Sequence, residues 1–359
     1  MKPNDVTTVR DTALAVRTGI PLAKKRGLTV KDVARVAGVA VGTVSRVLND
    51  NATVMPDVRE KVWVAMRELN YEPNAVARSM RAGATHVVGC IVSDVVQLTA
   101  AQMITGAERL LRDAGYAMFV ASARYDIAAE RDIIRSFRQR KIDGLILVIS
   151  NDEDPEYVAY LQALNLPIVL WERDAGGRFN CVLSDHRGGC SQATAYLLGL
   201  GHSRLALVTG HEKTWVGREM LRGYIEAHEA RNMPVNLDLV EGADKFDLNA
   251  CTRLLSGSKR PTAIIAPIND LAVVMSVAKG LGLRVPMDLS VVSVGDSNLI
   301  SMTSPALTVV RHDPRQVGKT AAELLLSLLG ANPPSEQRRV IFPAELVLRE
   351  SCVAPMSQA

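Results

Sequence analysis

Hydrophobic residues near the start of the chain recur three or four positions apart, which is helical spacing. Residues 28–49 run LTVKDVARVAGVAVGTVSRVLN, and this pattern predicts two short helices separated by a turn at Gly38. The first helix is expected to begin after Thr29, with Asp32 at a position where negative charge favours a helix start. The predicted buried positions are Val33, Val36 and Ala37 in the first helix and Val44, Val47 and Leu48 in the second.

The second helix, predicted over Val41–Leu48, leaves an open face of small and hydroxyl side chains around one arginine. Such a face suits the major groove of DNA. A third helix is predicted from Pro56, with a packing stripe formed by Val58, Val62, Trp63, Met66 and Leu69. Packed surface helices without a ligand are the alternative interpretation of this region.

From His86 onward, short apolar runs alternate with amphipathic stretches. Strands are predicted at 87–94, 116–122, 144–150, 167–173, 204–210, 262–267 and 289–296. Helices are predicted near 100–114, 126–140, 155–164, 188–200 and 216–231. This alternation is typical of parallel, doubly wound sheets. Because it restarts after about residue 188, we expect two α/β lobes in tandem with a cleft between them.

Length and charge are consistent with this division. A chain of 359 residues is too long for one ordinary core, and 48% hydrophobic with 22% charged residues is typical of a globular protein. Residues 1–81 carry fourteen Lys and Arg against eight Asp and Glu, a net +6, and the remainder is net −2. Basic charge therefore accompanies the predicted helix pair, as contact with phosphates requires.

Cysteines and histidines give no sign of a metal or a disulfide framework. The five cysteines are scattered without C-x-x-C spacing, which favours reduced thiols in a cytosolic protein. No apolar run approaches ~18 residues, and charges interrupt the N-terminus where a signal peptide would be apolar. We therefore expect a cytoplasmic protein with no cofactor, no metal and no membrane contact.

The string V-x-D-V-A-x-x-A-G-V-x-x-x-T-V-S-R-V-L-N, over residues 30–49, closely resembles the DNA-binding head of the lactose- and galactose-repressor family. Later strings such as RKIDGLIL, LGLGHSRLALVTG and RPTAIIAPIND extend the resemblance to about residue 350. The resemblance implies an all-α helix-turn-helix head, a hinge helix, and a bilobal core like that of periplasmic binding proteins. It also implies an allosteric repressor that acts as a homodimer on operator DNA and responds to a sugar, sugar acid or related metabolite.

The family pattern divides the chain into five parts. They are a mobile arm at 1–27, a DNA-binding domain at 28–71, a hinge helix or linker at 72–85, a bilobal effector-binding and dimerisation domain at 86–350, and a tail at 351–359. The first lobe is expected at about 86–185 and 311–341, and the second at about 186–296. This places the crossings between lobes near residues 185, 297 and 310.

DNA-contacting residues follow from the resemblance. Base reading is expected mainly from Val41 and Arg46, with Thr43, Ser45 and Asn49 nearer phosphates; Thr29 and Gly42 complete the set in the head. Gly42 lacks a side chain that commonly touches a base, and Ala40 replaces the serine often found at the second helix's N-cap. In the hinge, Asn74 and Arg78 match phosphate contacts of the family, Ala77 matches the residue that lies against the minor-groove floor, and Met80 takes the place of a wedging leucine.

Polar residues at or beyond strand ends are the candidates for effector binding. These are Asp94, Ser122, Asp185, Arg218, Asn269 and Asp296, with Trp215 as an aromatic that could stack on a sugar ring. The match to family positions is best for Arg218, Asn269 and Asp296. A surface or capping role is the alternative for each. Arg124, Arg173, Arg218 and His211 together favour an acidic sugar over a neutral one.

Two other functions fit parts of this pattern. A solute-binding receptor would share the bilobal core, but the basic head and the missing export signal argue against it. An enzyme is disfavoured because G-x-S-x-G, P-loop, G-x-G-x-x-G and metal-ligand spacings are absent from the sequence. We therefore expect a DNA-binding regulator without catalytic activity.

Overall fold

The computed structural model describes residues 28–48, 53–71 and 84–356. The chain divides into two compact units, Met1–Gly83 and Ala84–Ala359, which we describe separately. The predicted arm, the predicted hinge contacts Asn74, Ala77, Arg78 and Met80, and the predicted phosphate contact Asn49 lie outside the described residues.

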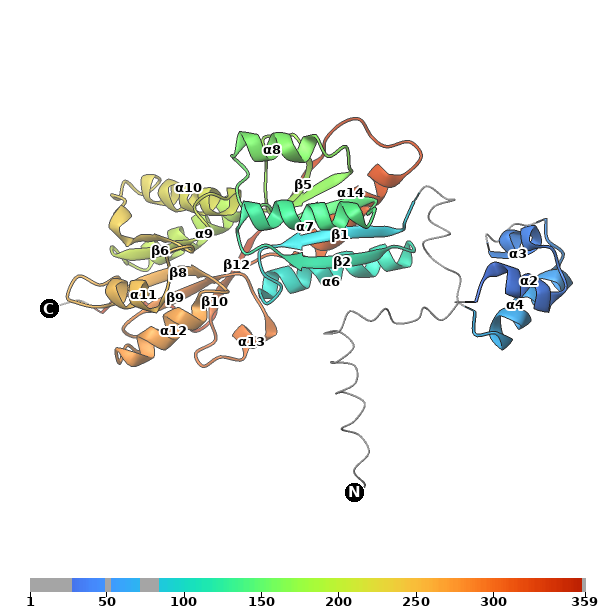
Figure 1. Ribbon diagram of the computed structural model, residues 1–359. Helices are drawn as coiled ribbons and strands as arrows, with labels where there is room; N and C mark the ends of the chain where they lie inside the picture. Colours follow the sequence, from blue (N-terminus) through green and yellow to red (C-terminus); the bar gives the residue numbers. More distant parts are fainter. Residues whose placement is uncertain (1–27, 49–52, 72–83, 357–359) are drawn as a thin grey trace, which may run out of the picture. The chain divides into compact units, whose positions relative to one another are not determined.

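The described residues of the N-terminal unit form the helices α2 (Val30–Ala37), α3 (Val41–Leu48) and α4 (Pro56–Glu68) (Figure 1). The carboxylate of Asp32 accepts from the backbone N–H and the hydroxyl of Thr29 at 2.9 and 2.8 Å, which fixes the start of α2. Gly38 ends α2 with φ +66°, a left-handed conformation that favours glycine.

The core of this unit confirms most of the predicted buried positions. Val33, Val44 and Val62 are each fully buried. Two predictions were wrong: Val36 is 44% exposed and Trp63 is 39% exposed. Both lie on helix sides that no other described helix covers, and the small residues Ala34 and Ala65 take the interior positions because the three helices cross closely there.

The first lobe is built on a six-stranded sheet with the order β11-β5-β4-β3-β1-β2. Its pairings are all parallel. The strands are β1 (Val87–Val92), β2 (Ala117–Ser122), β3 (Gly144–Leu147), β4 (Ile168–Trp171), β5 (Asn180–Ser184) and β11 (Arg339–Phe342). The helices are α6 (Leu98–Asp113), α7 (Ile127–Gln139), α8 (Pro155–Gln162) and α14 (Pro314–Leu329).

The second lobe repeats this design with the order β12-β10-β9-β8-β6-β7. Its strands are β6 (Leu205–Thr209), β7 (Val240–Gly242), β8 (Ala263–Pro267), β9 (Ser290–Val294), β10 (Thr308–Arg311) and β12 (Glu345–Val347). Only β12 runs antiparallel among these strands. The helices are α9 (His186–Gly199), α10 (Trp215–Glu229), α11 (Leu248–Leu255), α12 (Leu271–Gly280) and the short α13 (Asn298–Ser301), with the 3-10 turn η1 (Leu237–Leu239).

Each sheet is covered by helices on both faces, so each lobe has two hydrophobic clusters (Figure 1). In the first lobe, α7 and α8 pack on one face and α6 with α14 on the other. In the second, α11 and α12 pack opposite α9 and α10. Burial on both faces explains why the central strands are continuous apolar runs rather than alternating ones. The predicted fold class is confirmed.

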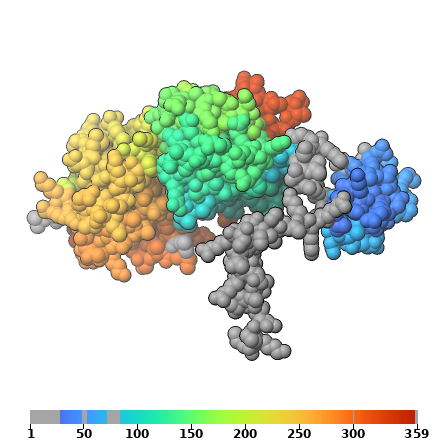
Figure 2. Space-filling view, viewed as in Figure 1, coloured from blue at the N-terminus to red at the C-terminus, as the bar shows by residue number. Residues whose placement is uncertain are grey.

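The chain passes between the lobes after β5, after β10 and after β11. The predicted crossing near residue 297 was wrong, because β10 pairs with β9 in the second sheet and the chain leaves that lobe only after Arg311. A late crossing at about residue 343 joins β11 to β12. Figure 2 shows the consequence: late residues, drawn in red, lie beside green residues of the first lobe.

The five cysteines are buried and carry free thiols. Among the described residues no helix is both long and apolar enough to cross a bilayer. Within the same part of the chain, no cluster of His, Cys, Asp and Glu could hold a metal ion.

Candidate functional site

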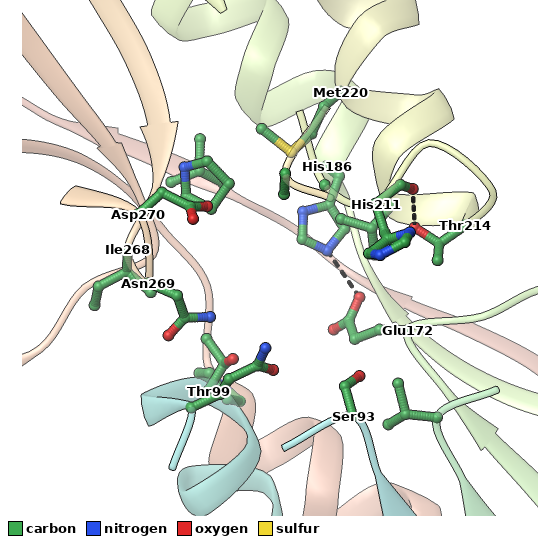
Figure 3. Close-up of a pocket in the computed structure, with 18 of the residues that line it drawn as sticks. Ser93, Thr99, Glu172, His186, His211, Thr214, Met220, Ile268, Asn269 and Asp270 are labelled. Atoms are coloured by element: carbon green, nitrogen blue, oxygen red, sulfur yellow. Dashed lines mark hydrogen bonds and ion pairs between the residues drawn. The ribbon is translucent and has the colours of Figure 1, made fainter. Parts of the chain in front are cut away.

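A cavity of about 220 Å³ lies where carboxyl ends of strands from both sheets meet (Figure 3). Ser93 follows β1, Glu172 follows β4, Gly210 follows β6, and Asn269 follows β8. In open parallel sheets this edge is where ligands bind, because the strand order reverses there. The repeated strand order of the two lobes therefore brings two such edges to one cavity.

A glutamate and a histidine are joined inside the cavity (Figure 3). The carboxylate of Glu172 accepts from Nε2 of His186 at 2.8 Å and from the hydroxyl of Ser184 at 2.6 Å. Burial alone would raise the pKa of Glu172, but His186 and Ser184 outweigh burial and hold it at about 2. Glu172 is thus an ionised acceptor, which assigns the proton to Nε2 of His186.

Three of the histidines that line the cavity have a buried ring nitrogen without a partner in the part of the chain that the structure describes. The Nδ1 atoms of His186, His211 and His312 are buried and have no hydrogen-bond partner among the described residues. The rings of His186 and His312 meet edge to face with centroids 4.9 Å apart. Burial lowers the pKa of His312 to about 4, so this ring is neutral near pH 7.

The second lobe contributes an amide and a carboxyl group from Asn269 and Asp270, which lie across the cavity from Glu172 (Figure 3). Burial raises the pKa of Asp270 to about 6. Tyr125 of the first lobe stacks on His211 of the second, with ring centroids 4.1 Å apart. The cavity wall is therefore shared by both lobes, and its shape depends on how they close.

Asp152, in the loop between β3 and α8, links the first lobe to helix α10 of the second. Its side chain is fully buried and accepts from the backbone N–H of Trp215 at 3.1 Å to each oxygen. The guanidinium of Arg218 donates to the same oxygens at 3.3 and 3.1 Å. Because Thr214 and Val216 of this segment line the cavity, the Asp152 contact positions part of its wall.

Of the seven predicted effector residues, Asn269 lines the cavity and the other six lie outside its lining. Arg218 is held by Asp152 and by Glu153, whose carboxylate lies 3.1 Å from Nε. Trp215 is 7% exposed and packs into the hydrophobic cluster of the first lobe. For these two residues an effector role stays a prediction, and the structure gives each a role in joining the lobes.

The remaining four predicted residues have local partners. Asp185 caps α9 by accepting from the N–H of Gly188, and Asp94 accepts from the N–H of Val96. The hydroxyl of Ser122 accepts from the N–H of Val95. Asp296 lies 2.7 Å from Arg349 and 3.1 Å from Arg311, and these arginines outweigh burial to lower its pKa. Their effector roles likewise stay predictions.

Sequence reasoning missed Glu172, His186 and His312 as cavity residues. Each follows a strand directly or begins the next helix, so position relative to the strand end was the available signal. The sequence patterns R-x-x-L-R-G-Y and V-x-D-S favoured Arg218 and Asp296 instead. In the structure, the charged groups of these two residues are paired with residues distant in sequence.

In the N-terminal unit, α3 presents the predicted reading face. Val41 is 42% exposed, Gly42 and Arg46 are exposed, and Thr43 and Ser45 are partly exposed. The opposite face of α3 is buried through Val44 and Val47. Thr29 is exposed at the start of α2. This is the arrangement in which a second helix can enter the major groove while the first packs behind it.

Comparison with known proteins decides the family. Residues 29–74 match the model of bacterial regulatory proteins of the lacI family, and residues 194–352 match a periplasmic binding protein-like domain. The chain is 32% identical over 334 residues to the HTH-type transcriptional repressor PurR of Aliivibrio fischeri strain MJ11, covering 90% of this chain and 98% of that protein. The chain belongs to the lacI family. It is a DNA-binding transcription regulator with an effector-binding core.

Other members of the lacI family show the same relationship. PurR of Vibrio cholerae is 33% identical, with 90% of this chain and 97% of that protein covered. The lac repressor dimer bound to operator and the anti-inducer ONPF has a TM-score of 0.81 at 26% identity, over 92% of this chain and all of that one. The regulator CelR in complex with cellobiose has a TM-score of 0.67 at 29% identity, over 90% and 100%.

Proposed function

We propose that this chain is a cytoplasmic, homodimeric repressor whose affinity for operator DNA is set by a small polar molecule bound in the cavity between the lobes. The observation that carries this proposal is the composition of the cavity wall. Polar side chains from both sheets line one space, and Tyr125 and Asp152 bridge the lobes beside it. A ligand held by both lobes favours one closure angle over another, which is what coupling to DNA requires.

The relatives support both halves of the proposal. Solved structures with the same fold carry operator DNA in one case and cellobiose in another. Relatives named as transcriptional repressors match over nearly their whole length. We propose no catalytic activity and no resident cofactor for this chain.

The edge of the first sheet supports the homodimer. Strand β2 ends the sheet, and Phe119 and Val120 on it are 40% and 39% exposed. An unpaired edge strand with exposed apolar side chains is normally covered by a partner. A second copy of this chain would also supply the second helix-turn-helix head that a palindromic operator needs.

The experiment that tests the proposal is selection of bound DNA from random genomic fragments by the full-length protein at moderate salt. We expect enrichment of a palindromic site, and an affinity for that site that changes when a metabolite mixture is added. Enrichment of no fragment would contradict the regulator assignment. An operator affinity that no metabolite alters would contradict the coupling.

A further inference from the structure

Arg173 is a buried arginine, 4% exposed, that lines the cavity. Its Nε donates to the carbonyl of Ile149 and its Nη1 to the carbonyl of Glu172, both at 2.7 Å. These acceptors are neutral, and among the described residues no carboxylate lies within 4.0 Å of the guanidinium. A guanidinium is always charged, and a buried charge without a counter-ion is strongly unfavourable.

The neighbouring acids form no direct ion pair with Arg173. The carboxylate of Glu172 already accepts from Ser184 and His186. Asp174 is engaged by Arg339, whose Nε lies 2.7 Å from it. Burial raises the pKa of Glu130, and the charge of Arg173 acts on Glu130 in the opposite direction. Arg173 is therefore a buried cation at the cavity that has no direct ion pair among the described residues.

The opposite side of the cavity has groups suited to hydroxyls. Asn269 and Asp270 lie there, across from Glu172 and His211 (Figure 3). An amide both donates and accepts, and a carboxylate accepts from two hydroxyls. The side chains of His186 and His211 line the same cavity. A ligand that satisfies all of these groups has several hydroxyls and one anionic end.

The size of the cavity limits the ligand. A cavity of about 220 Å³ has room for a small metabolite of about the size of one sugar unit.

We infer that the effector is a polyhydroxy carboxylic acid of monosaccharide size, a sugar acid whose carboxylate pairs with Arg173 and whose hydroxyls reach Asn269 and Asp270. This inference rests on the proposed function, because it takes the cavity as the regulatory site. The carboxylate supplies a direct ion-pair partner, which Arg173 does not have among the described residues. A charge-assisted pair of this kind is stronger than a neutral hydrogen bond.

The test is calorimetric titration of the full-length protein with matched pairs: gluconate and glucuronate against glucose, and galacturonate against galactose, with glucose 6-phosphate as a further anion. We expect at least one acid to bind roughly 10- to 100-fold more tightly than its neutral partner. Arg173→Met should remove that preference, and Arg173→Lys, which keeps the charge but loses the planar fork, should retain part of it. Arg138→Met, at an exposed arginine in the last turn of α7 that does not line the cavity, is the matched control and should change affinity less than about twofold.

Several results would overturn the inference. These are equal or tighter binding of the neutral sugar, binding of the phosphate ester while every acid fails, binding of no acid at all, or a preference for the acid that survives Arg173→Met. Should Arg173→Met fail to fold by circular dichroism, Arg173→Lys decides: an unchanged acid-to-neutral ratio counts against the role of the planar fork. Release or tightening of operator DNA by a neutral ligand would leave the regulator assignment intact and overturn only the sugar acid.

Discussion

The contact between Asp152 and helix α10 gives the sharpest prediction about how the lobes are joined. The Asp152 side chain is fully buried and accepts from the N–H of Trp215 and from the guanidinium of Arg218, which is 21% exposed. In Asp152→Asn, one oxygen can still accept from Trp215, but an amide then faces the guanidinium. Removing one partner of a buried ion pair typically costs about 3–5 kcal/mol.

We expect the lower end of this range, about 3 kcal/mol, because Arg218 keeps some exposure to water and a second carboxylate at Glu153. For a domain of this size, 1 kcal/mol corresponds to about 2–4 °C in Tm, so the core transition should fall by about 6–12 °C. Differential scanning calorimetry of the full-length protein at pH 7 and fixed concentration measures it.

Glu153→Gln is the matched control. Glu153 contacts the same guanidinium at 3.1 Å, but its side chain is 64% exposed. Exposed ion pairs contribute about 0–1 kcal/mol, so the Tm should change by less than about 4 °C. If the two variants lower Tm equally, or if Asp152→Asn has no effect, then Asp152 does not hold the lobes together as described.

Three further predictions concern the DNA head and the cavity. Arg46→Ala should reduce discrimination between operator and mutated operator by about 1–3 kcal/mol in a gel-shift series, and unchanged sequence preference would refute a base contact. Met66→Ala, at a site 5% exposed in the small helical core, should cost about 2–5 kcal/mol and abolish DNA binding while ligand binding survives. Met55→Ala, at a site 67% exposed, is its control and should leave DNA binding unchanged. Burial raises the pKa of Asp270 from 3.8 to about 6, so its contribution to stability is full below pH 3.8 and is lost as pH rises through 6. Asp270→Asn should therefore stabilise the ligand-free protein at pH 8, by up to about 3 kcal/mol, with the gain vanishing near pH 4, and a gain independent of pH would contradict this.

The local sequence pattern was enough to predict the strands in which consecutive residues are apolar and buried. Strands β1, β3 and β4 are apolar runs that are buried on both faces of the sheet, and each lies within its predicted range. Strand β5 was not predicted. It begins at Asn180, a polar residue that is buried because its amide group bonds Gln337 and Arg338, more than 150 positions away. No spacing rule reveals such a partner.

The same limit applies to the cavity. Asp296 lies just beyond β9 and Arg218 lies within α10, and the charged groups of both are bound by residues distant in sequence, Arg349 and Asp152. The position of Asn269 after β8 was enough to predict that it lines the cavity. Glu172 and His312 were accessible to the same rule, because each comes directly after the last residue of a strand. The rule identifies the edge of the sheet, and distant pairing decides which side chains remain available there.

The central claim is that occupancy of the cavity between the lobes controls the grip of the N-terminal heads on DNA. Its most direct test is the affinity of the full-length protein for its own selected operator, measured by fluorescence anisotropy with and without a saturating ligand of the cavity. We predict a change of about 5- to 150-fold in Kd, and a reciprocal change of the same factor in ligand affinity when operator is present. Equal operator affinities for the free and the ligand-saturated protein would contradict the account.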